Sequence, residues 1–159
     1  MLSINIICIG KIKEPFFKEA INEYSKRLSK YCKLEIIELA DEKIPSNPSN
    51  STIHDIKEKE CNKIFKHIKK DSYIICLDLG GKQLSSEDLS KKIDNLSFNY
   101  SHITFIIGGS LGLTKELLSS SNENMSFSTL TFPHQLIRIF LLEQIYRSFK
   151  ISNGETYHK

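Results

Sequence analysis

Short apolar runs recur along the chain at the length of buried β-strands. They consist mostly of isoleucine, leucine and other apolar residues, which is typical of strands covered on both faces. Three of them end at glycine: Gly10, the pair Gly80–Gly81 and the pair Gly108–Gly109. The pattern predicts strands over residues 2–9, 34–39, 72–79 and 103–107, and a short fifth strand over 125–127.

Between these runs, apolar residues recur at steps of three and four, which places them on one face of a helix. The expected first residues or N-caps of five helices are Pro15, Thr52, Ser85, Thr114 and Pro133. Thr52 with Asp55 resembles a capping box. Because strands and helices alternate, we expect an α/β fold, a parallel-rich sheet with helices on both faces.

The last predicted helix, residues 133–149, is apolar on most of its sides. A surface helix normally has one apolar stripe, so a helix of this kind must be buried. It therefore belongs either in the core or in an interface between subunits.

Composition sets loose limits on function. A chain of 159 residues suits one domain, and a net charge of +3 permits an RNA partner without requiring one. The N-terminus lacks the basic segment and cleavage site of a signal peptide, and no apolar run approaches the ~20 residues of a membrane helix. We expect a cytoplasmic protein with no membrane partner.

The four cysteines do not form a metal-binding pattern. Cys8 and Cys76 lie inside apolar runs, where a free cysteine behaves as a small hydrophobic residue. No pair has the CxxC or Cys/His spacing of a zinc site. We therefore interpret the cysteines as buried or surface thiols, and we expect no metal.

Ligands of open α/β sheets bind at the carboxyl ends of strands, and three such segments are candidates here: 77–82, 107–112 and 126–133. Glycines in the first two allow the backbone to approach a ligand closely. The spacing matches neither the GxGxxG motif nor the P-loop, which disfavours a dinucleotide or nucleoside triphosphate site. From the spacing alone, tight turns without a ligand are favoured over a cofactor site.

Two polar pairs stand out on the last helix. His134 and Arg138 are one turn apart on an otherwise apolar helix, so they need partners if they are buried. They are candidates for holding RNA phosphate or steering a proton, or they form a pair satisfied within a dimer interface. Glu143 and Arg147 have the same spacing, and for them we predict a structural salt bridge.

The C-terminal residues Tyr157, His158 and Lys159 combine an aromatic ring, an imidazole and an ammonium group. Such groups can stack on a base or contact phosphate. Taken alone, however, the end of a chain is more simply explained as a frayed tail.

An ordered set of motifs makes the sequence similar to one known family. The set comprises Gly10–Glu14, Gly108–Gly112, Leu130–Gln135, Glu143–Arg147 and Gly154–Lys159. It resembles the ribosomal RNA large subunit methyltransferase H family of the SPOUT superfamily along essentially the whole chain. The resemblance favours a cofactor site over plain glycine turns and a functional tail over a frayed one.

The resemblance implies a SPOUT-type fold with a C-terminal trefoil knot, residues 72–159 forming the knotted, cofactor-binding part of a single domain spanning 1–159. It also implies S-adenosylmethionine (SAM) as the cofactor. Carried over by position, the contacts to SAM would be Leu77, Gly108, Phe127, Ser128, Thr129, Leu130, Thr131 and Phe132.

The resemblance further implies a homodimer that methylates N3 of a pseudouridine in 23S rRNA within the assembled 70S ribosome. N3 must lose its proton to accept the methyl group. His158 is our candidate base, and the candidate positioning or electrostatic groups are Tyr157, Lys159, His134 and Arg138. The rival hypotheses are a ribosome-binding or assembly protein without catalysis, and a SAM-dependent enzyme that acts on tRNA.

Overall fold

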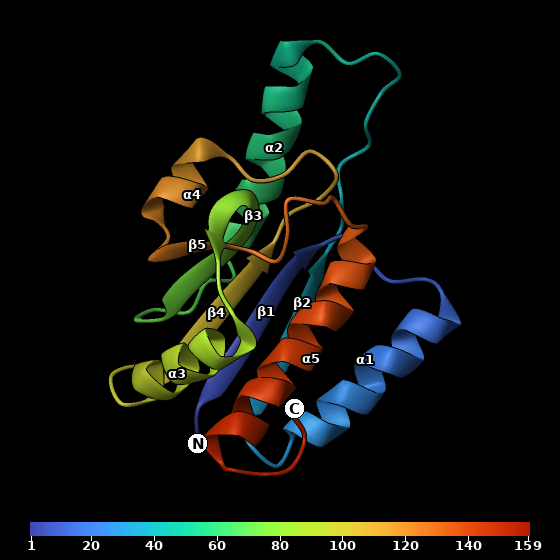
Figure 1. Cartoon of the computed structure of the whole chain (residues 1–159). Coiled ribbons are helices and arrows are strands. Elements are labelled where there is room, and N and C mark those ends of the chain that lie inside the picture. The colour runs from blue at the N-terminus through green and yellow to red at the C-terminus, as the bar shows by residue number, and fades with distance from the viewer.

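The computed structural model describes all 159 residues, and its centre is one five-stranded sheet (Figure 1). The strands are β1 (Ser3–Ile9), β2 (Lys33–Leu39), β3 (Tyr73–Gln83), β4 (His102–Ile107) and β5 (Glu123–Ser126). They lie in the order β2-β1-β4-β3-β5, and every neighbouring pair is parallel. The expected α/β class with a parallel sheet is confirmed.

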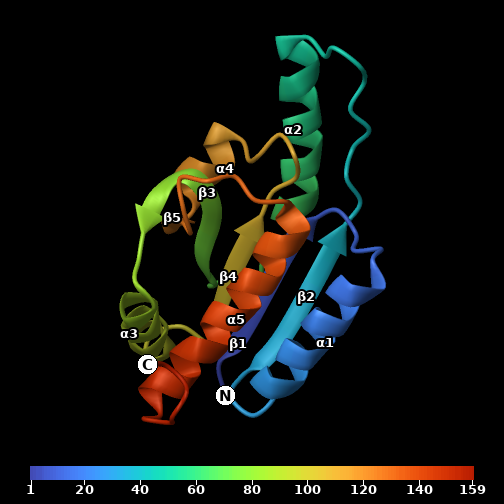
Figure 2. The same ribbon diagram turned by 45° about the vertical axis from the view of Figure 1, so that its right-hand side comes forward.

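Helices cover both faces of this sheet, as the two views in Figures 1 and 2 show. One face carries α1 (Pro15–Leu28), α3 (Ser86–Ser97) and α5 (His134–Ser152), and the other carries α2 (Asn50–Phe65) and α4 (Lys115–Ser120). Successive strand residues point to opposite faces. Ile6 of β1 accordingly packs in the core beneath α1, α3 and α5, whereas Ile7 packs in the core beneath α2 and α4.

Side-chain caps begin three of the helices. Ser85 accepts the Asp88 N–H at 3.0 Å, and Thr114 accepts the Leu117 N–H at 3.2 Å, as predicted. The predicted start of α2 is wrong, because Ser49 is its N-cap and accepts the N–H of Thr52 at 3.1 Å. A serine three residues upstream thus moves Thr52 into the first turn. The helices α4 and α5 also run further than expected, to Ser120 and Ser152.

The end of β3 also differs from the prediction. The strand does not stop at Gly80–Gly81 but continues to Gln83, with a register break against β5 between Leu77 and Lys82. A Cβ at Gly81 would lie 2.6 Å from backbone atoms of Met125. Glycine is therefore required there by the close approach of the neighbouring β5 backbone, not by a turn that ends the strand. The neighbouring strand β5 ends at Ser126 and begins at Glu123, two residues before the predicted start.

The helix α5 lies between α1 and α3, with Leu141, Leu142 and Ile145 fully buried. This explains why it is apolar on most of its sides. No helix, α5 included, combines the length and hydrophobicity needed to traverse a lipid bilayer.

All four cysteines are buried free thiols. Burial raises the pKa of Cys8 and Cys32 to about 12 and that of Cys76 to about 11. Each therefore serves as a packing residue, and Cys61 also accepts the Thr114 N–H through Sγ at 3.4 Å.

Candidate functional site

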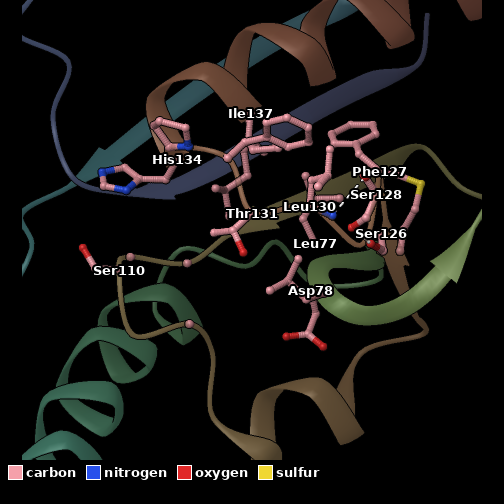
Figure 3. Close-up of a pocket in the computed structure, with 18 of the residues that line it drawn as sticks. Leu77, Asp78, Ser110, Ser126, Phe127, Ser128, Leu130, Thr131, His134 and Ile137 are labelled. Atoms are coloured by element: carbon pink, nitrogen blue, oxygen red, sulfur yellow. Dashed lines mark hydrogen bonds between the residues drawn. The ribbon is translucent and has the colours of Figure 1, made fainter.

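A cavity of about 690 Å³ opens beside the carboxyl end of β4 (Figure 3). Three separate stretches of backbone line it: residues 77–79 of β3, the loop 107–112 after β4, and the stretch 125–134 that joins β5 to α5. These are the three segments in which the sequence suggested a ligand site. Their meeting at one cavity follows from the parallel order of the strands.

The structure brings most of the expected SAM contacts together around this cavity. Seven of the eight line it: Leu77, Gly108, Phe127, Ser128, Leu130, Thr131 and Phe132. Thr129 is exposed and does not line it. Nine of the 19 lining residues are hydrophobic, and the volume lies in the ordinary range for small-molecule sites.

Hydrogen bonds fix the stretch that follows β5. The Ser126 hydroxyl donates to the Ser128 carbonyl at 2.8 Å, and the Ser128 hydroxyl accepts the Leu130 N–H at 3.0 Å. Figure 3 shows these side chains along one wall, with Leu130 and Thr131 next to Leu77. The wall is therefore set by local contacts rather than left as a free loop.

The loop after β4 is equally well defined. Gly112 has a φ of 81°, and its N–H donates to the Gly109 carbonyl at 3.0 Å, which closes a tight turn. A positive φ of this size favours glycine. A Cβ at Gly108 would lie 3.0 Å from the Leu113 side chain, so this position is also tightly packed.

The cavity contains two titratable side chains, Asp78 and His134. Asp78 is not among the individual site residues predicted from the sequence, although it directly follows Leu77 in a segment predicted to bind a ligand. Its carboxylate accepts the Gly80 N–H at 3.0 Å through Oδ2. Ile137 is a further lining residue, and it lies outside the three segments predicted from the sequence.

His134 lies at the first turn of α5, beside the end of β1. Its Nε2 is 3.2 Å from the position that a Cβ would take at Gly10. Partial burial, and to a smaller extent the charge of Arg138, hold the pKa of this imidazole below its usual value. The ring is therefore mainly neutral at neutral pH and keeps a lone pair for accepting a proton or a hydrogen bond.

Arg138 does not line the cavity. It is fully buried, and its guanidinium donates to Glu38 Oε2 at 2.7 Å and to the Gly10 carbonyl at 3.0 Å. Glu38 Oε2 also accepts the Ile12 N–H at 2.8 Å. The arginine therefore joins α5 to the end of β1 and to β2.

The C-terminal tail is held against the distal half of α5. The Tyr157 hydroxyl donates to Glu143 at 3.1 Å, and the Arg147 guanidinium lies 4.7 Å above the Tyr157 ring. His158 lies 3.1 Å from Arg147 through Nδ1 and 2.8 Å from Glu87 through Nε2. The tail is thus held in place and is not frayed, contrary to the prediction from these residues alone. The predicted Glu143–Arg147 salt bridge is confirmed at 2.7 Å.

The tail and the cavity lie at opposite ends of α5. Arg147 follows His134 by thirteen positions along the helix, roughly 20 Å at 1.5 Å per residue. None of Tyr157, His158 and Lys159 lines the cavity. The chain also has no cluster of three or more His, Cys, Asp or Glu residues able to hold a metal ion.

Comparison with known proteins assigns the class of this fold and cavity. The model of the family described as "Predicted SPOUT methyltransferase" matches residues 2–158. The chain therefore belongs to the SPOUT methyltransferase family, as the ordered motifs suggested.

Among individual relatives, two proteins named "Ribosomal RNA large subunit methyltransferase H" are similar over their whole length. Those from Clostridium botulinum (strain Kyoto / Type A2) and Clostridium novyi (strain NT) are 58% and 56% identical over 159 residues, covering 99% of this chain and 100% of each relative. A solved structure of "a probable methylase family protein" from Haemophilus influenzae Rd KW20 superposes with a TM-score of 0.53 at 12% identity, over 100% of this chain and 72% of that one. That likeness supports the fold alone.

Proposed function

We propose that this protein transfers a methyl group from SAM to N3 of a pseudouridine in 23S rRNA on the assembled ribosome. The observation that carries the proposal is the meeting of the three suspected segments at one cavity, in a chain that belongs to the SPOUT methyltransferase family. The names of the full-length relatives support ribosomal RNA of the large subunit as the substrate.

The lining of the cavity fits SAM. Apolar side chains such as Leu77 and Phe132 offer flat walls for an adenine, and the fixed backbone of the glycine loop offers hydrogen-bonding groups. Asp78 places a carboxylate where a ribose hydroxyl or an ammonium group would find a partner. When bound, SAM supplies a methyl group made reactive by the positive sulfonium.

The residues of the chain then have to align the acceptor and remove one proton. His158 is the proposed base for the N3 proton, with Tyr157 and Lys159 as positioning groups. His134 borders the cavity with a neutral ring and can orient the acceptor by a hydrogen bond. Arg138 acts indirectly, because it holds the backbone of Gly10 next to His134.

A homodimer would resolve the distance between the tail and the cavity. Large apolar side chains around the cavity are exposed, among them Leu79 at 57%, Leu130 at 67% and Phe140 at 38%. Exposed apolar surface of this kind marks a contact site. A second copy packed there would cover it and would bring His158 of the partner subunit towards the cavity.

We also propose that the C-terminal part of the chain is knotted. In both views the segment between β5 and α5 crosses the arc formed by the end of β3 (Figures 1 and 2). At Gly81 the backbone of β3 lies so close to Met125 of β5 that a side chain would not fit, so the chain is tightly packed at this place. A force measurement that pulls both termini apart tests the knot. A knotted chain should extend to a shorter end-to-end length than an unknotted chain of 159 residues, because the tightened knot holds some residues.

The decisive experiment combines binding with product analysis. The purified protein should bind SAM in a calorimetric titration and should methylate ribosomes taken from cells that lack the gene. Mass mapping of the 23S rRNA should then find one added methyl group on one pseudouridine. Binding to ribosomes without binding to SAM would contradict the proposal and would favour a ribosome-binding protein without catalysis.

A further inference from the structure

A buried carboxylate lies directly behind the glycine loop of the cavity. Glu60 of α2 is only 4% exposed, although most charged residues of this helix face solvent. Its Oε1 and Oε2 are 3.2 and 3.3 Å from the position that a Cβ would take at Gly109. Gly109 lines the cavity, and Figure 3 shows the loop that carries Ser110 passing beside α2. The carboxylate is thus separated from the cavity by a residue without a side chain.

No cation neutralises this carboxylate. Glu60 forms no ion pair, and its one hydrogen bond comes from the N–H of Glu42 to Oε2 at 3.1 Å. Lys63 is occupied elsewhere, since its ammonium binds Glu42 at 2.8 Å and the Ala40 carbonyl at 2.9 Å. A buried charge without a partner costs free energy, so its presence calls for an explanation.

The surroundings of Glu60 favour the arrival of a positive charge. Burial raises the pKa of its carboxyl, and the nearby carboxylates of Asp41 and Glu42 add to this effect. The Glu42 N–H and the charge of Lys63 act in the opposite direction. A cation bound in the cavity would relieve part of the cost of holding this charge, because Coulomb attraction is weakly screened in a buried site.

We propose that Glu60 makes the cavity select the positively charged methyl donor over its neutral product. This inference rests on the proposed function, under which SAM enters and S-adenosylhomocysteine (SAH) leaves. The two differ by one methyl group and by the positive charge on sulfur, which becomes a neutral thioether after transfer. A negative charge behind Gly109 attracts the sulfonium and gains nothing from the thioether, so the product is held less tightly than the donor.

The role of Glu60 is one of specificity and positioning, because the carboxylate acts across the glycine backbone. The same helix also fixes the far end of the loop, where Cys61 accepts the Thr114 N–H. The loop can therefore keep its shape when the charge of Glu60 is removed but its size is kept. This makes the electrostatic effect separable from a purely structural one.

The test measures the affinity of the full-length protein for SAM and for SAH by calorimetry. In Glu60→Gln the preference for SAM over SAH should fall by about threefold to tenfold, as expected for one charge acting through partly buried surroundings. Asp78 remains in the cavity, so some preference should persist. Glu60→Asp retains the charge and should keep most of the preference.

Glu58→Gln is the matched control, since Glu58 is on the same helix but is exposed and pairs with His54. It should leave the ratio of the two affinities unchanged. An equal loss of both affinities in Glu60→Gln, or no change, would overturn the proposal and leave Glu60 as a support of the loop. If Glu60→Gln does not fold, Glu60→Met provides a second neutral side chain of similar length. Failure of the wild-type protein to bind either compound would instead contradict the proposed function.

Discussion

The two ends of α5 carry similar side chains but have different surroundings. At the first turn, His134 borders the cavity and Arg138 is fully buried against Glu38 and Gly10. In the last turns, Arg147 is partly exposed and binds Glu143, His158 and the face of Tyr157. The first end thus borders the cavity, whereas the second holds a tail whose residues do not line it. Under the proposed function, the cavity and the candidate base His158 therefore come from different subunits, which the following experiments test.

The strongest test of this comparison mixes two defective variants. Thr131→Trp should fill the cavity, and His158→Ala should lower methyl transfer at least about tenfold, as for loss of a general base. If each tail serves the cavity of the other subunit, a mixed dimer keeps one intact site. Random pairing should then restore about a quarter of the wild-type rate, because about half of the dimers are mixed. No recovery after unfolding and joint refolding would indicate a tail that acts on its own chain.

Removing the arginine at each end should affect stability unequally. Arg138→Met should lower the free energy of unfolding by about 2–4 kcal/mol, since it breaks buried hydrogen bonds to Glu38 and to the Gly10 carbonyl. Arg147→Met should cost only ~1 kcal/mol, because its ion pair with Glu143 is partly exposed. Urea titration measures both values. Equal losses would show that the two ends are held with similar strength.

A smaller loss of stability is expected when the hydroxyl group of Tyr157 is removed. Tyr157→Phe removes the hydrogen bond to Glu143 but keeps the ring contacts with Tyr146 and Arg147. Stability should fall by about 0.5–1 kcal/mol. Amide hydrogen exchange should become faster in residues 153–159 and should remain unchanged around the cavity. Unchanged exchange in the tail would mean that the ring alone holds it.

The smallest expected effect is the contribution of His134 to the pH dependence of stability. Its pKa is lowered in the folded state by burial and then by Arg138, so the unfolded chain binds the proton more readily. Acidification through the ordinary histidine range should therefore destabilise the protein, and stability should return as pH rises again. His134→Gln should reduce this loss between pH 7.5 and 5.5 by less than about 1 kcal/mol, since the ring is partly exposed. Urea titrations of both proteins at the two pH values provide the measurement, and identical losses would contradict the prediction.

The sequence predicted the strands and most helix starts because these depend on local patterns. Isoleucine-rich runs became strands, and Ser85 and Thr114 became caps, since each needs only its neighbours along the chain. The extension of β3 beyond Gly81 was missed, because Gly81 is required by the close approach of the Met125 backbone in β5 and not by a local turn.

The candidate site was predictable only in part, for a similar reason. Strand ends indicated the three lining segments, but no local pattern places His158 near Glu87 or Arg138 against Glu38. The burial of Glu60 could not be predicted from its neighbours in the sequence, because it lies in a run of alternating charges that is typical of a solvated helix face. Its burial arises from the distant loop that passes over it.

The burial of all four cysteines has a practical consequence for following this protein in solution. With pKa values raised to about 12 for Cys8 and Cys32 and about 11 for Cys76, little reactive thiolate forms near neutral pH. A native sample should therefore resist alkylation, and the rate of alkylation should report opening of the core. A cysteine introduced at the exposed Thr156 would be the one quickly labelled thiol, so a fluorophore placed there could follow the movement of the tail without interference from the native cysteines.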